Sequence, residues 1–155
     1  MYLDNDIDFS GEPLRTFSVS KNTPTVDVAG TFDGLGHTIR NFDMNISSLS
    51  YIGLISDSQG MAIRNLVLDS TCSLKGTNLN GINGLGIGGF VGKCTGDKND
   101  CRLENVVNMM EIQMPIGASG NLVGGIVGSC KASSFGCIVR NCLNFGSVNQ
   151  INGVE

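Results

Sequence analysis

The chain has 155 residues, 41% of them hydrophobic and 15% charged, with a formal net charge of -4 at pH 7. This length suits one domain with a substantial core, and the composition excludes a disordered chain. The ten basic residues are scattered, so a nucleic-acid-binding role is not expected, because such binding depends on Lys and Arg neutralising phosphates. The 22 glycines, with little Ala, Glu or Lys, argue against helix throughout.

Nothing in the sequence predicts direct membrane insertion. No apolar run approaches the roughly 20 residues that a spanning helix needs. The opening Met1-Tyr-Leu-Asp-Asn-Asp6 is acidic and lacks the basic and apolar regions of a signal peptide. Two interpretations remain, a cytosolic protein or a piece of a longer chain, and we favour the piece.

Residues 1–29 are expected to form an irregular N-terminal cap layer, followed by repeats over residues 30–155. Apolar Leu3, Ile7 and Phe9 share the alternation of a half-buried strand with the acidic residues between them. Arrays of stacked repeats need such atypical, more polar end layers to cover the edge of their core.

The first clear layer begins at Gly30. Phe32-Asp-Gly-Leu-Gly36 is expected to be a tight turn, with a strand over residues 39–44 after it. The next layer holds apolar stretches at residues 51–55 and 63–68, separated by a turn near Gly60.

Two near-copies, residues 87–108 and 123–144, follow. Their landmarks recur at a constant offset of 36 residues, a spacing typical of stacked repeat proteins. The landmarks of the first copy are Gly88, Gly89, Gly92, Cys94, Cys101, Asn105 and Asn108, and those of the second are Gly124, Gly125, Gly128, Cys130, Cys137, Asn141 and Asn144.

An apolar residue, a charged residue and an Asn recur in the second strand of each layer. In stacked parallel strands, equivalent residues lie roughly 4.8 Å apart. The apolar members are therefore expected to stack in the core, and the charged members to face solvent. The Asn side chains are expected to form a structural ladder at a corner. Its four members are Asn41, Asn65, Asn105 and Asn141.

These patterns predict an all-β fold, a β-solenoid of about four coils with a period of about 36 residues. A Leu-rich horseshoe would show its own Leu spacing and helical stretches, and an antiparallel sandwich would not explain the constant offset. A three-sided coil with a loop suits 36 residues. The stretch from Phe145 to Glu155 ends where the next apolar-Gly-Gly segment is due, without a polar cap. We therefore expect further repeats or a partner chain at the C-terminal end.

The pattern Gly-Gly-Phe-Val-Gly92 or Gly-Gly-Ile-Val-Gly128, followed by Asn141-Cys-Leu-Asn and Gly146-Ser-Val148, resembles the GLUG repeat. The Phe32–Asn41 segment resembles the stretch that often leads into such arrays, so the resemblance covers roughly residues 28–150. GLUG repeats occur in bacterial and protist surface proteins and in regions preceding the catalytic part of bacterial immunoglobulin A1 metallopeptidases. The resemblance implies a right-handed parallel β-helix outside the cell, often adhesin-like.

The cysteines are the most distinctive chemical feature. Cys94 and Cys101 enclose one short loop, and Cys130 and Cys137 enclose its copy. Pairing within each loop is preferred, but stacking also allows Cys94 with Cys130 and Cys101 with Cys137. In the cytosol the thiols would stay free. A bridge from Cys72 to Cys142 is also open, although Cys142 takes an apolar position.

No metal or other cofactor is expected. Six residues between paired cysteines exceed the usual spacing of structural zinc motifs. Asp97, Asn99 and Asp100 offer oxygen ligands for calcium, but the copied loop lacks them, which favours a solvated loop tip.

An enzymatic role is not expected, and no catalytic residue is assigned. His37 is the single histidine, four residues after Asp33, and the His-Glu-x-x-His motif of the metallopeptidases is absent. The leading hypothesis is a non-catalytic β-solenoid at the cell surface or outside the cell, serving as an adhesin-like binding module or a stalk. Its partners would be glycans or proteins, with Tyr2, Tyr51 and Phe135 as contact residues. The alternative is a fragment of a carbohydrate-active β-helix enzyme that uses His37 or Asp33.

Overall fold

The computed structural model describes residues 1–10, 30–46, 51–76, 86–96, 99–115, 122–132 and 135–151. Every regular element among them is a β-strand, so the protein is all-β, as the sequence predicts. The strands are β1 (Ile7–Asp8), β2 (Gly30–Asp33), β3 (Thr38–Arg40), β4 (Asp43–Ile46), β5 (Tyr51–Ile52), β6 (Ile55–Ser58), β7 (Met61–Leu68), β8 (Ser73–Gly76), β9 (Gly86–Gly88), β10 (Val91–Gly96), β11 (Cys101–Asn108), β12 (Glu111–Pro115), β13 (Leu122–Gly124), β14 (Val127–Ala132), β15 (Cys137–Arg140), β16 (Leu143–Asn144) and β17 (Val148–Ile151).

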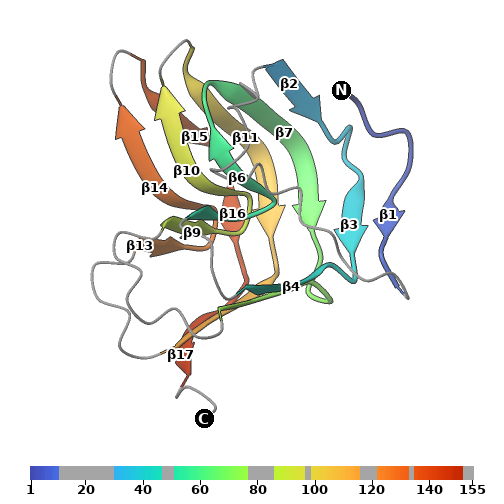
Figure 1. The fold of residues 1–155 in the computed structure, drawn as a ribbon. Coiled ribbons are helices and arrows are strands. Elements are labelled where there is room, and N and C mark those ends of the chain that lie inside the picture. The colour runs from blue at the N-terminus through green and yellow to red at the C-terminus, as the bar shows by residue number, and fades with distance from the viewer. Residues whose placement is uncertain are drawn as a thin grey trace.

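The strands form four parallel sheets (Figure 1). The largest, here the β7 sheet, contains β1, β2, β3, β7, β11, β15 and β16. The β10 sheet contains β6, β10 and β14, the β9 sheet contains β5, β9 and β13, and the β12 sheet contains β4, β8, β12 and β17. The three sides suggested by the repeat length are therefore wrong, because separate sheets form before and after each Gly-Gly.

The chain passes through the β9, β10, β7 and β12 sheets in the same order three times. These passes are layer 2 (residues 51–76), layer 3 (86–115) and layer 4 (122–151). Layer 1 (30–46) supplies strands to the β7 and β12 sheets.

The predicted offset of 36 residues is confirmed between layers 3 and 4. It holds in all four sheets, as in the pairs Val91 with Val127, Val107 with Leu143, Ile112 with Val148 and Gly86 with Leu122. Between layers 2 and 3 it varies, because the connections differ in length: Tyr51 pairs with Gly86 and Ala62 with Arg102.

An Asn residue bends the long strands β7 and β11 at mid-length. In β7, Met61 and Ile63 point inward before Asn65, and Leu66 and Leu68 point inward after it. Two consecutive outward residues at the bend break the strand's usual two-residue alternation. The bend thus keeps both halves of the strand facing the core.

The core is a set of apolar columns that run from layer to layer. Ile63 pairs with Leu103, Leu66 with Val106 and Leu74 with Ile112, and all six side chains are at most 1% exposed. The predicted inward stacking is confirmed for Ile63 and Leu103, whereas Ile39 pairs with Leu68 in another column. Layer 4 carries the same columns to an open face, where the exposed hydrophobic residues include Val123, Val139, Leu143, Phe145 and Val148.

Glycines bring backbones of neighbouring layers into direct contact where the β9 and β10 sheets meet. A Cβ added at Gly92 would collide with the backbone of Ile52 below it, and one at Gly128 with the backbone of Ile87. We call this region the glycine corner, formed by Gly53, Gly88, Gly92, Gly124 and Gly128.

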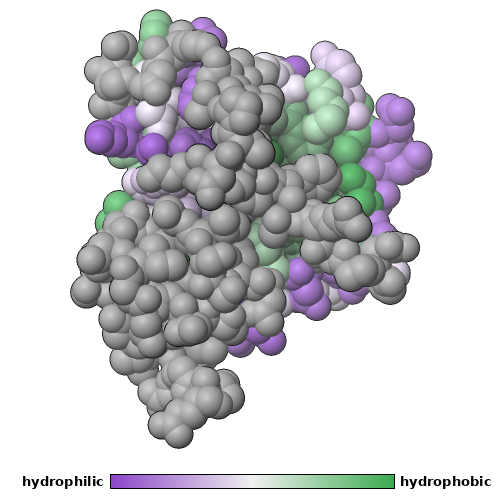
Figure 2. Space-filling view, in the orientation of Figure 1, coloured by the Kyte–Doolittle hydropathy of each residue, from purple (hydrophilic) through white to green (hydrophobic). Residues whose placement is uncertain are grey.

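The N-terminal segment continues the β7 sheet. Ile7 pairs with Ile39, and Tyr2 forms a parallel bridge with Asp33. Hydrophilic residues gather at the edge where this segment lies (Figure 2). The remainder of the predicted cap, residues 11–29, lies outside the described residues.

Candidate functional site

Three Asn residues with a left-handed backbone form one corner of the β7 sheet. Asn65, Asn105 and Asn141 have φ angles of 53°, 53° and 52°. Asn tolerates this region better than most residues because its short polar side chain can bond locally. The Asn105 amide donates to Asn65 Oδ1 at 3.1 Å. Asn141 lies beside Asn105, since the preceding residues Glu104 and Arg140 are register partners.

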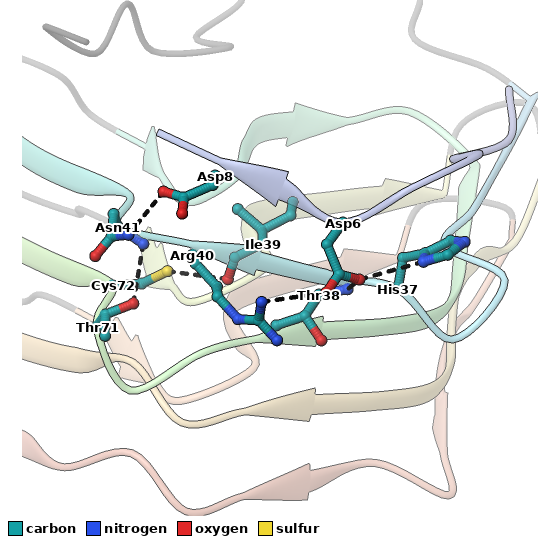
Figure 3. Close-up of polar contacts among 9 residues, drawn as sticks. All are labelled: Asp6, Asp8, His37, Thr38, Ile39, Arg40, Asn41, Thr71 and Cys72. Atoms are coloured by element: carbon teal, nitrogen blue, oxygen red, sulfur yellow. Dashed lines mark hydrogen bonds and ion pairs between the residues drawn. The ribbon is translucent and has the colours of Figure 1, made fainter. Parts of the chain in front are cut away.

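Asn41 does not belong to this column, which corrects the predicted ladder. Asp33 is the register partner of Arg64, and Asn65 donates to Asp33 Oδ1 at 2.9 Å. Asn41, with a φ of 54°, lies at the next corner, where its side chain donates to Asp8 and its backbone N–H to Thr71 (Figure 3). The cause is the Phe32–Gly36 turn, which interrupts the strand of layer 1. The Ile-Arg-Asn sequence follows this turn and therefore reaches the second corner of the layer, not the first.

The single histidine belongs to a polar cluster at the N-terminal edge, formed by Asp6, His37 and Arg40 (Figure 3). Asp6 Oδ1 lies 3.2 Å from His37 Nδ1 and accepts the Thr38 N–H at 2.9 Å, while Arg40 Nη1 lies 3.3 Å from Oδ2. The Thr38 bond is the main cause that lowers the pKa of Asp6. The carboxylate thus ties the N-terminal segment to layer 1.

Asp33 has a different set of partners from His37. It accepts the Leu35 N–H at 3.0 Å and the Asn65 amide, and it pairs with Arg64 Nε at 2.8 Å. These bonds, led by the one from Leu35, lower the pKa of this buried carboxyl group. His37 and Asp33, the two residues considered for an enzymatic role, therefore contact separate sets of structural partners.

Acidification is expected to destabilise the protein through Asp33. Because its pKa is lowered in the fold, the stability it contributes is fully present above its unfolded value of about 3.9. That contribution is lost as the pH falls through the folded pKa, so the window lies below about pH 4. Urea denaturation between pH 3 and 7 is expected to show Asp33→Asn less stable than the parent at neutral pH, with a smaller further loss in acid.

The exposed Asp4→Asn is the matched control for this series and is expected to follow the parent curve. Parallel curves for the parent protein and Asp33→Asn across the acid range would contradict this role for Asp33.

Charges of alternating sign cross the outer face of the β7 sheet. Asp33, Arg64, Glu104 and Arg140 are successive register partners on adjacent strands. Arg140 Nη2 lies 2.8 Å from Glu104 Oε1, matching the Asp33–Arg64 contact. Exposure rises along this outer charged row, from the buried Asp33 to Arg140, which is 60% exposed at the open end.

The predicted aromatic contact residues lie on different parts of the surface. Tyr2 is 65% exposed at the N-terminal edge, and Phe135 is 44% exposed in the loop between the layer-4 cysteines. Tyr51 is half-buried, with Lys93 Nζ 4.7 Å from its ring centroid, so its face already engages a cation. The structure does not bring the three together.

Cys94 and Cys101 form a disulfide within layer 3, with their Cα atoms 6.0 Å apart. Closing this short loop stabilises the fold by about 2.5 kcal/mol in the chain-entropy model. The copied pair, Cys130 and Cys137, is in register one strand away and carries free thiols. Pairing between layers, which stacking also allowed, does not occur for the layer-3 cysteines.

The other two cysteines are free and lie in different layers. Cys72 is buried, and its Sγ donates to Ile39 O, while burial raises the pKa of its thiol. Cys142 is half-buried and contacts Leu103 O and Arg140 O. The structure has no bridge between them.

The loop considered for calcium uses its acidic side chain within the protein. Asp100 Oδ1 accepts the Gly136 N–H at 2.9 Å, and Oδ2 pairs with Arg102 at 2.8 Å. Asp97 lies outside the described residues. In the described part of the chain, no group of three or more His, Cys, Asp or Glu side chains is placed to hold a metal ion.

A second, buried Asn contact links layers 3 and 4. Asn108 is fully buried, and its amide donates to Asn144 Oδ1 at 2.8 Å. The amides pack under the Gly-Gly pairs, because a Cβ at Gly89 would meet Asn108 and one at Gly125 would meet Asn144. All four residues of this contact, the two Asn and the two Gly, are landmarks of the 36-residue offset. The spacing alone does not indicate that they touch.

Comparisons of the chain with protein-family models, curated proteins and solved structures give no match. The resemblance to GLUG repeats therefore remains a prediction from the sequence. Within the described residues, no helix has the length and apolar character needed to cross a membrane.

Proposed function

We propose that the chain is a right-handed parallel β-helix that serves as a non-catalytic, surface-displayed module for adhesin-like binding or as a stalk. The observation that carries this proposal is the constant 36-residue register between layers 3 and 4 in all four sheets. A register that is the same on every side allows layers to be added without changing the surface pattern. Such stacking produces elongated, quasi-one-dimensional proteins with extended binding faces.

The topology supports a right-handed helical path. Every strand pair among the described residues is parallel, and the connections between parallel strands are right-handed in nearly all proteins. The resemblance to GLUG repeats, which implies the same path, adds independent support from the sequence.

Binding would use the side chains that the strands and loops present outward. The outer charged row offers donors and acceptors at the spacing of the strands, roughly 4.8 Å. Exposed Phe135 and Tyr2 offer apolar faces of the kind that binding hot spots favour. Glycans or protein segments are the partners that this combination suits.

A location outside the cell or on its surface agrees with the Cys94–Cys101 disulfide, since such bonds persist mainly in oxidising compartments. The same location is what the GLUG resemblance implies.

Binding is tested with a glycan array and a host-cell binding assay. Removal of a contact aromatic in Phe135→Ala or Tyr2→Ala is expected to weaken a detected interaction about tenfold, the effect of losing roughly 1.4 kcal/mol. Phe145→Ala, which removes an aromatic ring that is 71% exposed at the open face of layer 4, is the matched control. Blank results in both assays would remove the adhesive half of the proposal.

The open face of layer 4 fits one further layer of the same 36-residue kind. Its exposed columns continue buried ones: Leu103 is 1% exposed and its partner Val139 47%, Ile112 is 0% exposed and its partner Val148 44%. The outer charged row ends on Arg140, so the alternation of sign calls for an acidic residue next. A layer like layer 3, with Glu104 at that position, provides it.

Appending a copy of residues 84–119 after Glu155 keeps the 36-residue offset and is expected to raise the melting temperature. The added layer buries the apolar columns, places a copy of Glu104 beside Arg140, and should reduce binding of a hydrophobic dye such as ANS. The control carries Ala at the copy of Gly92, where a Cβ would meet backbone below. Equal melting temperatures for the parent and the extended protein would contradict a stalk built by adding layers.

A further inference from the structure

Cys130 and Cys137 have the backbone arrangement of a pair that is already bonded. Cys94 is the register partner of Cys130, and Cys101 that of Cys137, so β14 and β15 repeat the geometry of β10 and β11. In layer 3 this geometry joins the two cysteines in a disulfide. In layer 4 the two cysteines are free thiols, close enough that Cys130 contributes to the raised pKa of Cys137.

The two pairs differ in their access to solvent. Cys94 and Cys101 are 1% and 0% exposed, and Cys101 Sγ lies 3.1 Å from Ser58 Oγ of layer 2. Cys130 is exposed and Cys137 half-buried, because layer 4 forms the open face. A solute can therefore reach the outer pair, whereas the protein covers the inner pair.

We propose that Cys130 and Cys137 form a reversible redox site that reacts with small-molecule disulfides, while the Cys94–Cys101 disulfide beneath it stays closed. The site does not depend on the proposed binding function, but it requires the open face of layer 4, because an added layer would cover Cys130 as the protein covers Cys94.

The reaction is thiol–disulfide exchange in two steps. The exposed Cys130 thiolate attacks one sulfur of a small disulfide such as oxidised glutathione, forms a mixed disulfide and releases one small thiolate. Cys137 then loses its proton to water and attacks Cys130 Sγ, which forms the Cys130–Cys137 bond and releases the second small thiolate. Two protein thiols are oxidised, one small disulfide is reduced to two thiols, and reduced glutathione drives the reverse reaction.

The structure assigns the second role to Cys137. Burial, together with the neighbouring Cys130, raises the pKa of its thiol to about 12, so it is protonated at neutral pH and a poor first nucleophile. Closure of the bond is therefore expected to be the slower step and to accelerate as the pH rises.

Tryptic mapping distinguishes every pairing, because Lys and Arg separate the cysteines. Cys94, Cys101, Cys130 and Cys137 fall in peptides 94–98, 99–102, 103–131 and 132–140. The full chain is incubated with reduced or with oxidised glutathione, its free thiols are alkylated in denaturant, and it is then digested. Peptides 103–131 and 132–140 are expected to be alkylated after reduced glutathione and joined after oxidised glutathione, with 94–98 and 99–102 joined in both samples.

Three results would overturn the proposal: both layer-4 peptides still alkylated after oxidation, peptide 103–131 joined to 94–98, or the inner disulfide opening as readily as the outer one. Cys137→Ser is expected to trap one glutathione on peptide 103–131, since no second thiol remains to displace it. Cys142→Ser, which removes another half-buried thiol of layer 4, is expected to behave like the parent. Failure of Cys137→Ser to retain glutathione would also overturn the assignment of Cys130 as the first nucleophile.

Discussion

Gly92→Ala is expected to lower the free energy of unfolding by at least about 3 kcal/mol, the upper range for overpacking, because the new methyl group has backbone on its far side. A Cβ at this position would lie 2.8 Å from both Ile52 O and Ser56 O and closer still to Ile52 N. Side chains can rotate away from such contacts, but these atoms belong to the backbone of layer 2. Layers 2 and 3 would have to separate, which would break pairing on both sides of the glycine corner.

Gly136→Ala is the matched control. Its Cβ would meet only Asp100 Oδ1, at an ordinary 3.6 Å, so a change within about 0.5 kcal/mol is expected. Urea denaturation followed by circular dichroism measures both variants. A denaturation midpoint for Gly92→Ala equal to that of the parent protein would show that the layers are not in backbone contact at this corner.

The glycine pattern explains why the repeat could be predicted from residue spacing. Gly92 and Gly128 lie above strands β5 and β9, and each must lack a side chain for its layer to pack against the layer below. In layer 2 the register partner of Gly92 is Ser56, and strands of the β9 and β10 sheets are described only from layer 2 onward. The constant offset in the sequence thus reflects the lack of space for a side chain where one layer stacks on the next.

The misplaced Asn41 shows where the same reasoning fails. Left-handed Asn residues occur at two different corners: Asn65, Asn105 and Asn141 lie at the first corner, and Asn41 lies at the second. Matching the Ile-Arg-Asn letters therefore aligned Asn41 with Asn65, although Asp33 and Gly34 hold that place in layer 1. Only the inter-strand register, which depends on the length of the Phe32–Gly36 turn, separates the two corners.

The spacing of the polar residues could be seen in the sequence, but their contacts could not be predicted from it. His37 meets Asp6 from a segment 31 residues earlier, and nothing in either stretch indicates this meeting. The number of sheets was also misjudged, since the repeat length suggested three sides and the strands form four sheets. Pairing within the Cys94–Cys101 loop was predictable because its ends flank six residues and lie on consecutive strands.

Asn108→Ala is expected to destabilise the protein by about 2–3 kcal/mol, the cost of leaving buried polar groups unpaired. Asn108 Oδ1 accepts the Met110 N–H at 3.2 Å, and its amide donates to Asn144. Both partners would lose these bonds, Met110 in a fully buried position. Asn144→Ala, which alters an exposed residue of the same pair, is expected to cost about 1 kcal/mol or less. Denaturant titration of the two variants measures the difference.

Two further substitutions distinguish hydrogen bonding from packing at this position. Leu68 is the register partner of Asn108 in layer 2, so a leucine has room in an equivalent place. If packing alone mattered, Asn108→Leu would be neutral or stabilising; we expect it to destabilise, because the Met110 N–H stays unpaired.

Asn108→Asp keeps an acceptor for that N–H but buries a charge. Its carboxyl pKa should be raised by burial, so the variant should be least stable at neutral pH and recover as the pH falls toward about 4, the opposite of the dependence expected from Asp33. A flat pH response of Asn108→Asp would mean that water reaches this residue, and that the contact beneath the glycine pairs is not closed.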